Sequence, residues 1–150
     1  MLALLIVLNI LVWTAFLSLP DGNLHVTVFD VGQGEAILIR TPDGQNILVD
    51  SGPDPVSTSA QLGKTLPFWD RKIDLLILTQ LQSDHISGTL DLLHKYDINS
   101  AGLPPSTSRA LLPAEIINGL NTRHVRLYTL HDGMQLNPGR DIRKIGRAHV

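Results

Sequence analysis

An apolar run lies in the middle of the chain and extends from Ile73 to Leu78. Its length and composition are typical of a β-strand that is buried on both faces. Before it, residues 24–29, 36–40 and 46–49 alternate apolar and polar side chains, as half-buried strands do. The turn sequence Pro42-Asp43-Gly44 predicts that the last two of these segments form a hairpin.

Strands and helices alternate in the second half of the sequence. Helices are expected over residues 56–66, 88–96 and 114–120, and strands over 98–103 and 125–130. Hairpin strands followed by such alternation indicate a layered α/β domain with helices packed on a sheet. A chain of 150 residues, 43% of them hydrophobic, is long enough for one such core and not comfortably for two.

The apolar start of the chain predicts a membrane anchor. Residues 1–20 carry no charged side chain, and about 20 apolar residues in a helix span the hydrocarbon core of a bilayer. A cleaved signal peptide would have a basic start and a shorter apolar stretch, and a buried core helix would show a polar stripe. We therefore expect a transmembrane helix over 1–20, an integral protein of the cell membrane, and a soluble domain from residue 21. The first basic residue is Arg40, so the domain is expected outside the cytoplasm.

Composition narrows the chemistry. The sequence has no cysteine, which excludes disulfides and thiolate metal ligands and leaves His, Asp and Glu as candidate ligands. A net charge of -2 provides no broad basic surface, so contacts with nucleic acid would need a local patch.

The most informative polar residues follow the buried strand. Asp84 and His85 are adjacent at its carboxyl end, where sites form in such sheets, and their carboxylate and imidazole could converge on one cation. Gly88 would let the backbone turn into the next helix. The alternative is an aspartate that caps this helix beside an exposed histidine.

Two further polar loops follow strands. Asp50 and Gly52 come after residues 47–49 and either bring a second carboxylate to the same edge or form an Asx-type turn. The loop from Asp30 to Glu35 contains two glycines that permit close backbone approach, to a ligand or within a turn. Its candidate residues are Asp30, Gly32, Gln33 and Gly34. The other histidines show no ligand spacing, and most are expected to face solvent; they are His25, His94, His124, His131 and His149.

Together these loops resemble a known family. The run HVTVFDVGQGEAILIRTPDGQNILVDSGPD and the later IDLLILTQLQSDHISG are similar to the metallo-β-lactamase-like domain of ComEC-type DNA-uptake proteins. The resemblance covers about residues 24–136. It implies an α/β fold that is the N-terminal half of a metallo-β-lactamase-type αββα sandwich, preceded by one transmembrane helix. The truncated domain would occupy residues 21–143.

The chain departs from the family's metal-binding motif, His-x-(His or Asp)-x-Asp-His. Gln80 and Gln82 stand where the first two ligands belong, and a neutral amide is a poor transition-metal ligand. Asp84 and His85 keep half of the second site, with Asp84 as the catalytic candidate, while the later ligands would lie beyond this chain. The resemblance thus implies one divalent metal, Zn or Mn, in the full-length protein and no good binding by this fragment.

The resemblance also implies a role. The expected protein is a channel component in natural transformation, with little or no hydrolase activity. Its partners would be single-stranded DNA, the membrane and channel segments of the same protein. An active metal-dependent nuclease that degrades the non-transported strand is one alternative, and a secreted metallo-β-lactamase-like hydrolase is another.

The last seven residues look foreign to the domain. KIGRAHV, residues 144–150, reads like the conceptual translation of a sequencing adapter, so these residues are excluded from the expected fold.

Overall fold

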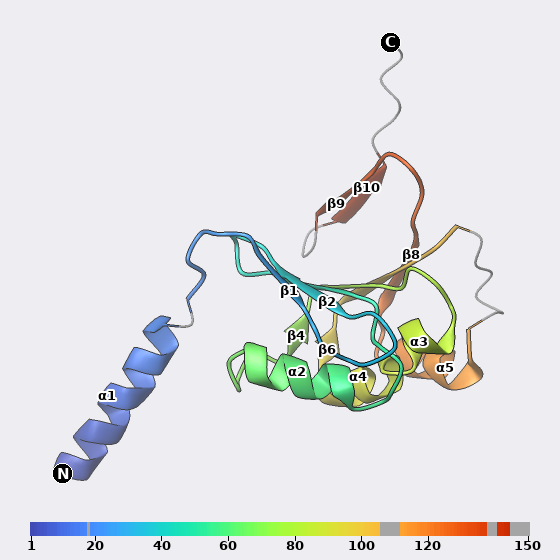
Figure 1. Cartoon of the computed structure of the whole chain (residues 1–150). Coiled ribbons are helices and arrows are strands. Elements are labelled where there is room, and N and C mark those ends of the chain that lie inside the picture. Colours follow the sequence, from blue (N-terminus) through green and yellow to red (C-terminus); the bar gives the residue numbers. More distant parts are fainter. Residues whose placement is uncertain (18, 106–111, 138–140, 145–150) are drawn as a thin grey trace.

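The computed structural model describes residues 1–17, 19–105, 112–137 and 141–144 (Figure 1). Its helices are α1 (Leu2–Leu17), α2 (Ser57–Thr65), α3 (Ser83–Ile86), α4 (Thr89–Lys95) and α5 (Ala114–Thr122). Its strands are β1 (His25–Val28), β2 (Ile37–Arg40), β3 (Asn46–Val49), β4 (Lys72–Ile73), β5 (Leu75–Ile77), β6 (Asp97–Ile98), β7 (Ser100–Leu103), β8 (Arg126–Thr129), β9 (Met134–Asn137) and β10 (Asp141–Lys144). The expected α/β class is confirmed.

A mixed sheet forms the centre of the domain, with the strand order β1-β2-β3-β5-β7-β8. The strands β1, β2 and β3 pair antiparallel, which confirms the predicted hairpin, and β3, β5, β7 and β8 pair parallel. Parallel neighbours need crossover connections, and α2, α4 and α5 lie in these connections on one side of the sheet (Figure 1). The carboxyl ends of β3 and β5 consequently lie at the same edge of the sheet.

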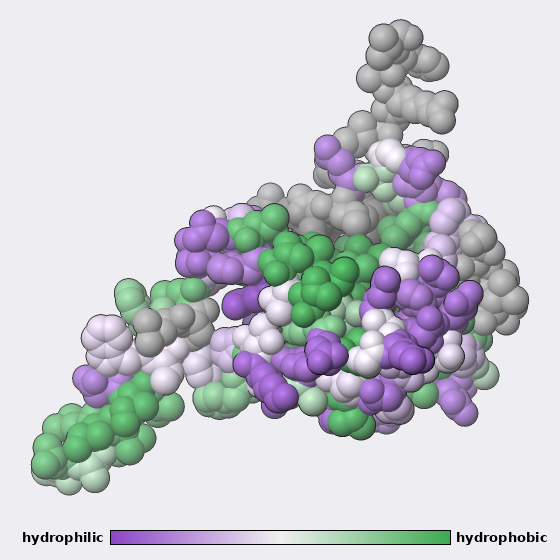
Figure 2. All heavy atoms as spheres, in the orientation of Figure 1, coloured by the Kyte–Doolittle hydropathy of each residue, from purple (hydrophilic) through white to green (hydrophobic). Residues whose placement is uncertain are grey.

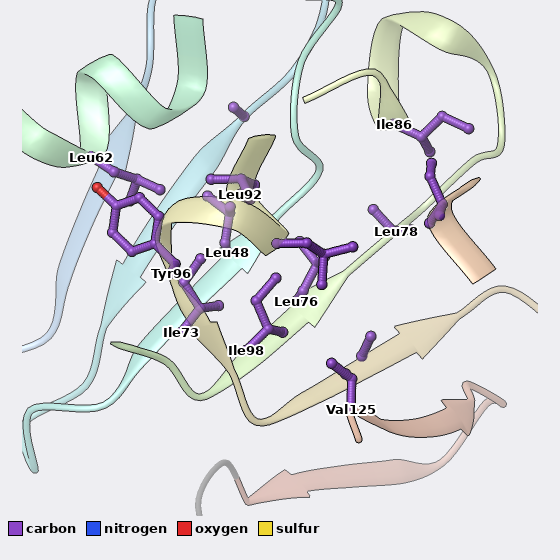
Figure 3. Packing of buried hydrophobic residues seen from close by; sticks show 14 of the residues in the cluster. Leu48, Leu62, Ile73, Leu76, Leu78, Ile86, Leu92, Tyr96, Ile98 and Val125 are labelled. Carbon is purple, nitrogen blue, oxygen red and sulfur yellow. The ribbon is translucent and has the colours of Figure 1, made fainter. Parts of the chain in front are cut away.

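The core lies between the sheet and these helices. Leu48 of β3 is opposite Leu76 of β5, and both are fully buried. Figure 3 shows Leu62 of α2 together with Leu92 and Tyr96 of the α4 segment against them. Full burial of one such side chain stabilises a fold by about 1.5–3 kcal/mol, so this cluster fixes the helical layer on the sheet.

The other face of the sheet is also apolar, and part of it is open. Val26 and Val28 of the edge strand β1 are 58% and 72% exposed. The register places Val28 beside Ile37, and Ile37 beside Val49, all on the face away from the Leu38–Leu48 pair. Figure 2 shows hydrophobic residues gathered over β1 and β2. A sheet that is apolar on both faces is typical of a layer with partners on each side.

Two predicted strands are interrupted. The run 73–78 is divided into β4 and β5 at Asp74, and the predicted strand 98–103 is divided into β6 and β7 at Asn99. The side chain of Asp74 is buried, forms an ion pair with Lys72 and accepts a hydrogen bond from Asn46 N at 2.9 Å. The prediction of one continuous strand over 73–78 was wrong because the buried carboxylate of Asp74 requires Lys72 and the backbone N–H of Asn46 as partners, which a regular ladder does not supply.

The stretch between β5 and α4 differs from the predicted loop. Residues 83–86 form the short helix α3, in which Ile86 N donates to Gln82 O at 3.2 Å and Ser87 N donates to Ser83 O at 3.2 Å. Asp84 and His85 therefore lie on a helical turn, where their side chains take directions set by the helix.

The ends of the chain bear on two predictions. The apolar start forms α1, which has 16 residues, and no helix among the described residues is both long and apolar enough to cross a membrane. The transmembrane helix expected over 1–20 stays a prediction. Of the segment 144–150, Lys144 ends β10 and residues 145–150 lie outside the described residues.

Candidate metal centre

Three loops meet at the carboxyl edge of β3 and β5. Asp50 directly follows β3, and its backbone N–H donates to Ile77 O at 2.8 Å, which ties the loop to the neighbouring strand. Thr79 follows β5, and α3 begins four residues later. The parallel pairing of these two strands thus brings polar groups from distant parts of the sequence together, as the sequence predicted for Asp50 and His85.

Asp50 is the buried centre of this edge. Its side chain has no exposed surface and accepts hydrogen bonds from Thr79 N at 2.8 Å, Thr79 Oγ1 at 2.6 Å and His85 Nδ1 at 2.9 Å. Three donors compensate the burial of one carboxylate. Asp50 also has a φ of 57°, a conformation that aspartate tolerates better than most residues. The carboxylate points to the neighbouring strand and α3, so the alternative of a purely local Asx turn is wrong.

His85 lies against this carboxylate. The histidine is 7% exposed, which contradicts the alternative of an exposed histidine beside a capping aspartate. A carboxylate accepts hydrogen bonds, so Nδ1 carries the hydrogen in the contact with Asp50, and Nε2 presents its lone pair when the ring is neutral. Nε2 lies 3.6 Å from Asp84 Oδ2. A histidine held this way by an outer carboxylate is the usual arrangement of a metal-ligating imidazole.

The surroundings also set the charge of His85. Its hydrogen bond to Asp50 raises the pKa of the imidazole above the ordinary value, burial opposes this shift, and the charges of the nearby carboxylates raise the pKa further. The ring therefore holds a proton more readily than a histidine in water.

Ser51 fixes the backbone of α3 through two hydrogen bonds. Ser51 N and Ser51 Oγ both donate to His85 O, at 2.7 Å and 2.9 Å, and Ser51 Oγ lies 2.9 Å from Thr89 Oγ1. Gly88 permits this approach, since a Cβ on it would lie 2.0 Å from Ser51 O. The glycine that the sequence assigned to a turn is required by close packing.

The Asp30–Glu35 loop closes the site from the third side. A Cβ on Gly34 would lie 2.5 Å from Asp84 O, so the loop passes directly over α3 because this residue is glycine. Ligand atoms of Glu35, Asp50 and His85 all lie within 4.8 Å of one another. Glu35 was absent from the predicted site, although its position between a glycine turn and β2 was the available signal.

Other residues of the predicted site are exposed. Gln80 and Gln82 are exposed on the loop between β5 and α3. Asp30 is exposed, and its backbone carbonyl accepts a hydrogen bond from Gln61 Nε2 at 3.1 Å. Gly32 and Gln33 are exposed as well, and Gly32 has a φ of 81°.

Gly52, in the loop after β3, packs closely against α2. Its φ of 76° favours glycine, and a Cβ there would lie 2.8 Å from Thr58 Oγ1. Of the remaining histidines, four are exposed as predicted, and His149 lies outside the described residues; the four are His25, His94, His124 and His131.

The donor set determines which metal centre is compatible with the chain. A two-metal centre built on the family's motif does not fit, since Gln80 and Gln82 offer only neutral amides. A single divalent ion does fit the edge, because a buried histidine there is oriented by a carboxylate and has two further carboxylates, Asp84 and Glu35, near its ring.

Fold and site together define an α/β domain with a histidine and carboxylate cluster at the carboxyl edge of a mixed sheet. The sequence model of the Metallo-beta-lactamase superfamily matches residues 29–118, which is more than half of the chain. The chain belongs to the metallo-β-lactamase superfamily.

A curated relative extends this identification. Competence protein ComA of Neisseria gonorrhoeae is 31% identical over 71 residues, which is 47% of this chain and 10% of that protein. With the superfamily match, this similarity confirms the resemblance to a ComEC-type domain that the loop Asp30–Glu35 indicated. The chain spans a small part of the competence protein's length.

Two solved structures are also similar. MEM-A1, a subclass B3 metallo-beta-lactamase from a soil metagenome library, is 21% identical with a TM-score of 0.46, over 80% of this chain and 52% of that one. FIM-1 from Pseudomonas aeruginosa, in its mono-zinc form, is 14% identical with a TM-score of 0.38, over 77% of this chain and 56% of that one. The chain thus spans about half the length of each enzyme.

Proposed function

We propose that this chain is the metallo-β-lactamase-like domain of a membrane-anchored DNA-uptake protein and that it has little or no hydrolase activity. The loop Asp30–Glu35 and the similarity to a competence protein support the role in DNA uptake. The channel segments of the same protein and single-stranded DNA are the proposed partners.

One observation carries the proposed loss of activity. Gln80 and Gln82 occupy the positions of the motif's first two ligands, and both are exposed on the loop that precedes α3. An exposed amide has water as an alternative partner and no charge to attract a cation, so these residues do not replace imidazole or carboxylate ligands. Without that site, the pair of ions that intact relatives would use for phosphodiester hydrolysis cannot assemble.

Three other residues fix the structure at the carboxyl edge of β3 and β5. Asp50 orients the ring of His85, Ser51 holds the backbone of α3, and Gly34 lets the first loop pass over it. A bound divalent metal would supply positive charge for polarising a phosphoryl oxygen or lowering the pKa of water. The chain's own contribution is a rigid surface at the end of the sheet, which we assign to contacts with the DNA or with the channel segments.

The open sheet face supports the finer architecture. We propose that β1 to β8 form the first half of an αββα sandwich and that a second sheet of the same longer protein packs on Val26, Val28 and Ile37. Val26 and Val28 are mostly exposed, and neighbouring exposed apolar side chains of this kind mark a surface that packs against another element. The domain would follow a membrane anchor at residues 1–20 and lie outside the cytoplasm.

An active nuclease is the second candidate, and the pair Asp84 and His85 favours it. Both residues keep the chemistry of their motif positions, and Nε2 and Oδ2 lie close enough to share one ion. One ion with a water ligand is sufficient for some hydrolytic reactions.

Two experiments test the proposal. Hydrolysis of bis(p-nitrophenyl) phosphate by the 150-residue chain with zinc or manganese should not exceed that of the ions alone. Metal-dependent turnover that Asp84→Ala abolishes would support the nuclease instead. Disruption of the gene in its host should abolish transformation by labelled DNA, and an unchanged transformation frequency would contradict the role in uptake.

A membrane test addresses the anchor. The chain should resist extraction by carbonate from host membranes, whereas the chain without residues 1–20 should be released. Release of both would contradict the anchor.

A further inference from the structure

Two aromatic side chains are exposed at the tip of the turn between α2 and β4. Asp70 N donates to Pro67 O at 2.9 Å, so residues 67–70 form a β-turn with Phe68 and Trp69 at its centre. Phe68 is 71% exposed and Trp69 is 46% exposed. Their ring centroids lie 4.6 Å apart in an edge-to-face arrangement, so the two rings form one apolar projection.

Hydrogen bonds fix this turn on the sheet. Asn46, at the start of β3, donates through its side-chain amide to Asp70 Oδ2 at 2.9 Å and to Lys72 O at 3.0 Å. Arg71 Nε donates to Phe68 O at 3.2 Å. The backbone that carries the rings is thus already ordered, which lowers the entropic cost of binding a partner.

The end of α1 meets the same edge of the sheet. Leu19 and Pro20 follow α1 and line a pocket with Arg40 and Gly44. A Cβ on Gly44 would lie 2.5 Å from Pro20 Cγ. Arg40 is opposite Asn46 in the register of β2 and β3, and the amide of Asn46 holds the turn. The turn therefore lies on the side of the domain from which α1 extends (Figure 1).

We propose that the turn 67–70 rests on the membrane, with the rings of Phe68 and Trp69 inserted at the level of the lipid headgroups. The inference rests on the proposed function, because it takes α1 as an anchor in the same bilayer. Aromatic side chains are enriched at the interfaces of membrane proteins. Trp13 and Phe16, the other exposed phenyl and indole rings among the described residues, lie near the carboxyl end of α1 and would occupy the same interface.

The charges around the turn fit lipid better than DNA. Proteins that bind single-stranded DNA combine aromatic rings with a positively charged groove. In the segments 64–74 and 96–98, which adjoin the turn, basic and acidic residues are equal in number; they are Lys64, Arg71, Lys72, Asp70, Asp74 and Asp97. The rings therefore lack the basic track that phosphates require, and an apolar interface suits them.

Tryptophan fluorescence of the 150-residue chain in phosphatidylcholine vesicles tests the inference. Trp13→Phe leaves Trp69 as the single tryptophan. Lipids brominated near the headgroup should reduce its fluorescence at least about twofold, because the indole lies at the interface. The matched control combines Trp13→Phe, Trp69→Phe and Tyr128→Trp, which moves the tryptophan to β8, level with Val49 near the carboxyl edge of the sheet. Its fluorescence should not change.

A further variant separates this inference from the anchor. Trp69→Phe leaves Trp13 as the single tryptophan, so its quenching reports on α1. Quenching of Trp13 without quenching of Trp69 overturns the inference and leaves the anchor standing. Quenching of Trp69 alone contradicts the anchor and leaves the contact of the turn standing, and quenching of neither overturns both.

Two more results would overturn the inference. Equal quenching of Trp69 and of the Tyr128→Trp control would show that the lipid contact is not specific to the turn. Oligothymidylate that quenches Trp69 more strongly than the brominated vesicles do would place single-stranded DNA on the rings instead.

Discussion

His85 Nδ1 lies 2.9 Å from Asp50 Oδ2, and this contact joins the loop after β3 to the helix α3 across 35 residues of sequence. The orientation of the imidazole and the direction of Nε2 toward Asp84 follow from this pair.

Asp50→Asn should lower the pKa of His85 in the metal-free chain, because the raised value derives first from the hydrogen bond to the carboxylate. In the parent chain, this bond contributes stability fully below the ordinary histidine pKa, and the contribution is lost as pH rises through the folded value. Proton NMR titration of the ring in the presence of a chelator measures the change. The exposed hairpin variant Asp43→Asn is the control and should leave His85 unchanged, whereas an unchanged pKa in Asp50→Asn would contradict the assignment.

Gly88→Ala should destabilise the domain by about 3 kcal/mol or more, because its methyl group would collide with the backbone carbonyl of Ser51. Gly63→Ala is a matched control. Gly63 lies in α2 with no atom within 4 Å of an added Cβ, so the change should stabilise by about 0.5–1 kcal/mol. Urea unfolding measures both, and similar midpoints for the two variants would show that the packing of Gly88 on Ser51 is unimportant.

Gln80→His combined with Gln82→Asp should raise the affinity for zinc and add a second equivalent of lower affinity. Both side chains are exposed, so the free energy of unfolding should change by less than about 0.5 kcal/mol. Titration with a zinc-sensitive dye compares the double variant with the parent chain. Identical binding curves would mean that the loop does not point these positions toward the centre.

Val26→Thr combined with Val28→Thr should reduce binding of an apolar dye such as ANS by the 150-residue chain. The two valines stand on the open face of an edge strand, and threonine keeps the β-branched shape that strands favour. Thr27→Val is the control, because residue 27 lies on the opposite face of the sheet, and this change should not reduce dye fluorescence. Undiminished fluorescence in the double variant would place the apolar surface elsewhere.

The sequence predicted most of the sheet because alternation and turn residues are local signals. Residues 46–49 form the predicted strand, and the hairpin at Pro42-Asp43-Gly44 joins the predicted partners. The break at Asp74 was missed because its partner Asn46 lies 28 residues away in the sequence and meets it only after folding.

The site was predictable in part for the same reason. Asp50 and His85 follow strands, so the edge of the sheet could be inferred for both. Glu35 reaches this edge because Gly34 lets its loop cross α3, and no spacing rule encodes that approach. The burial of His85 could not be predicted from the sequence either, since it depends on contacts with Ser51 and Asp50 that form only in the fold.

We propose that Gln80 and Gln82 remove one of the family's two metal sites. Elemental analysis of zinc per chain, after saturation and removal of weakly bound metal, tests this proposal. We expect one zinc atom or fewer per chain. Two tightly held atoms per chain would contradict it.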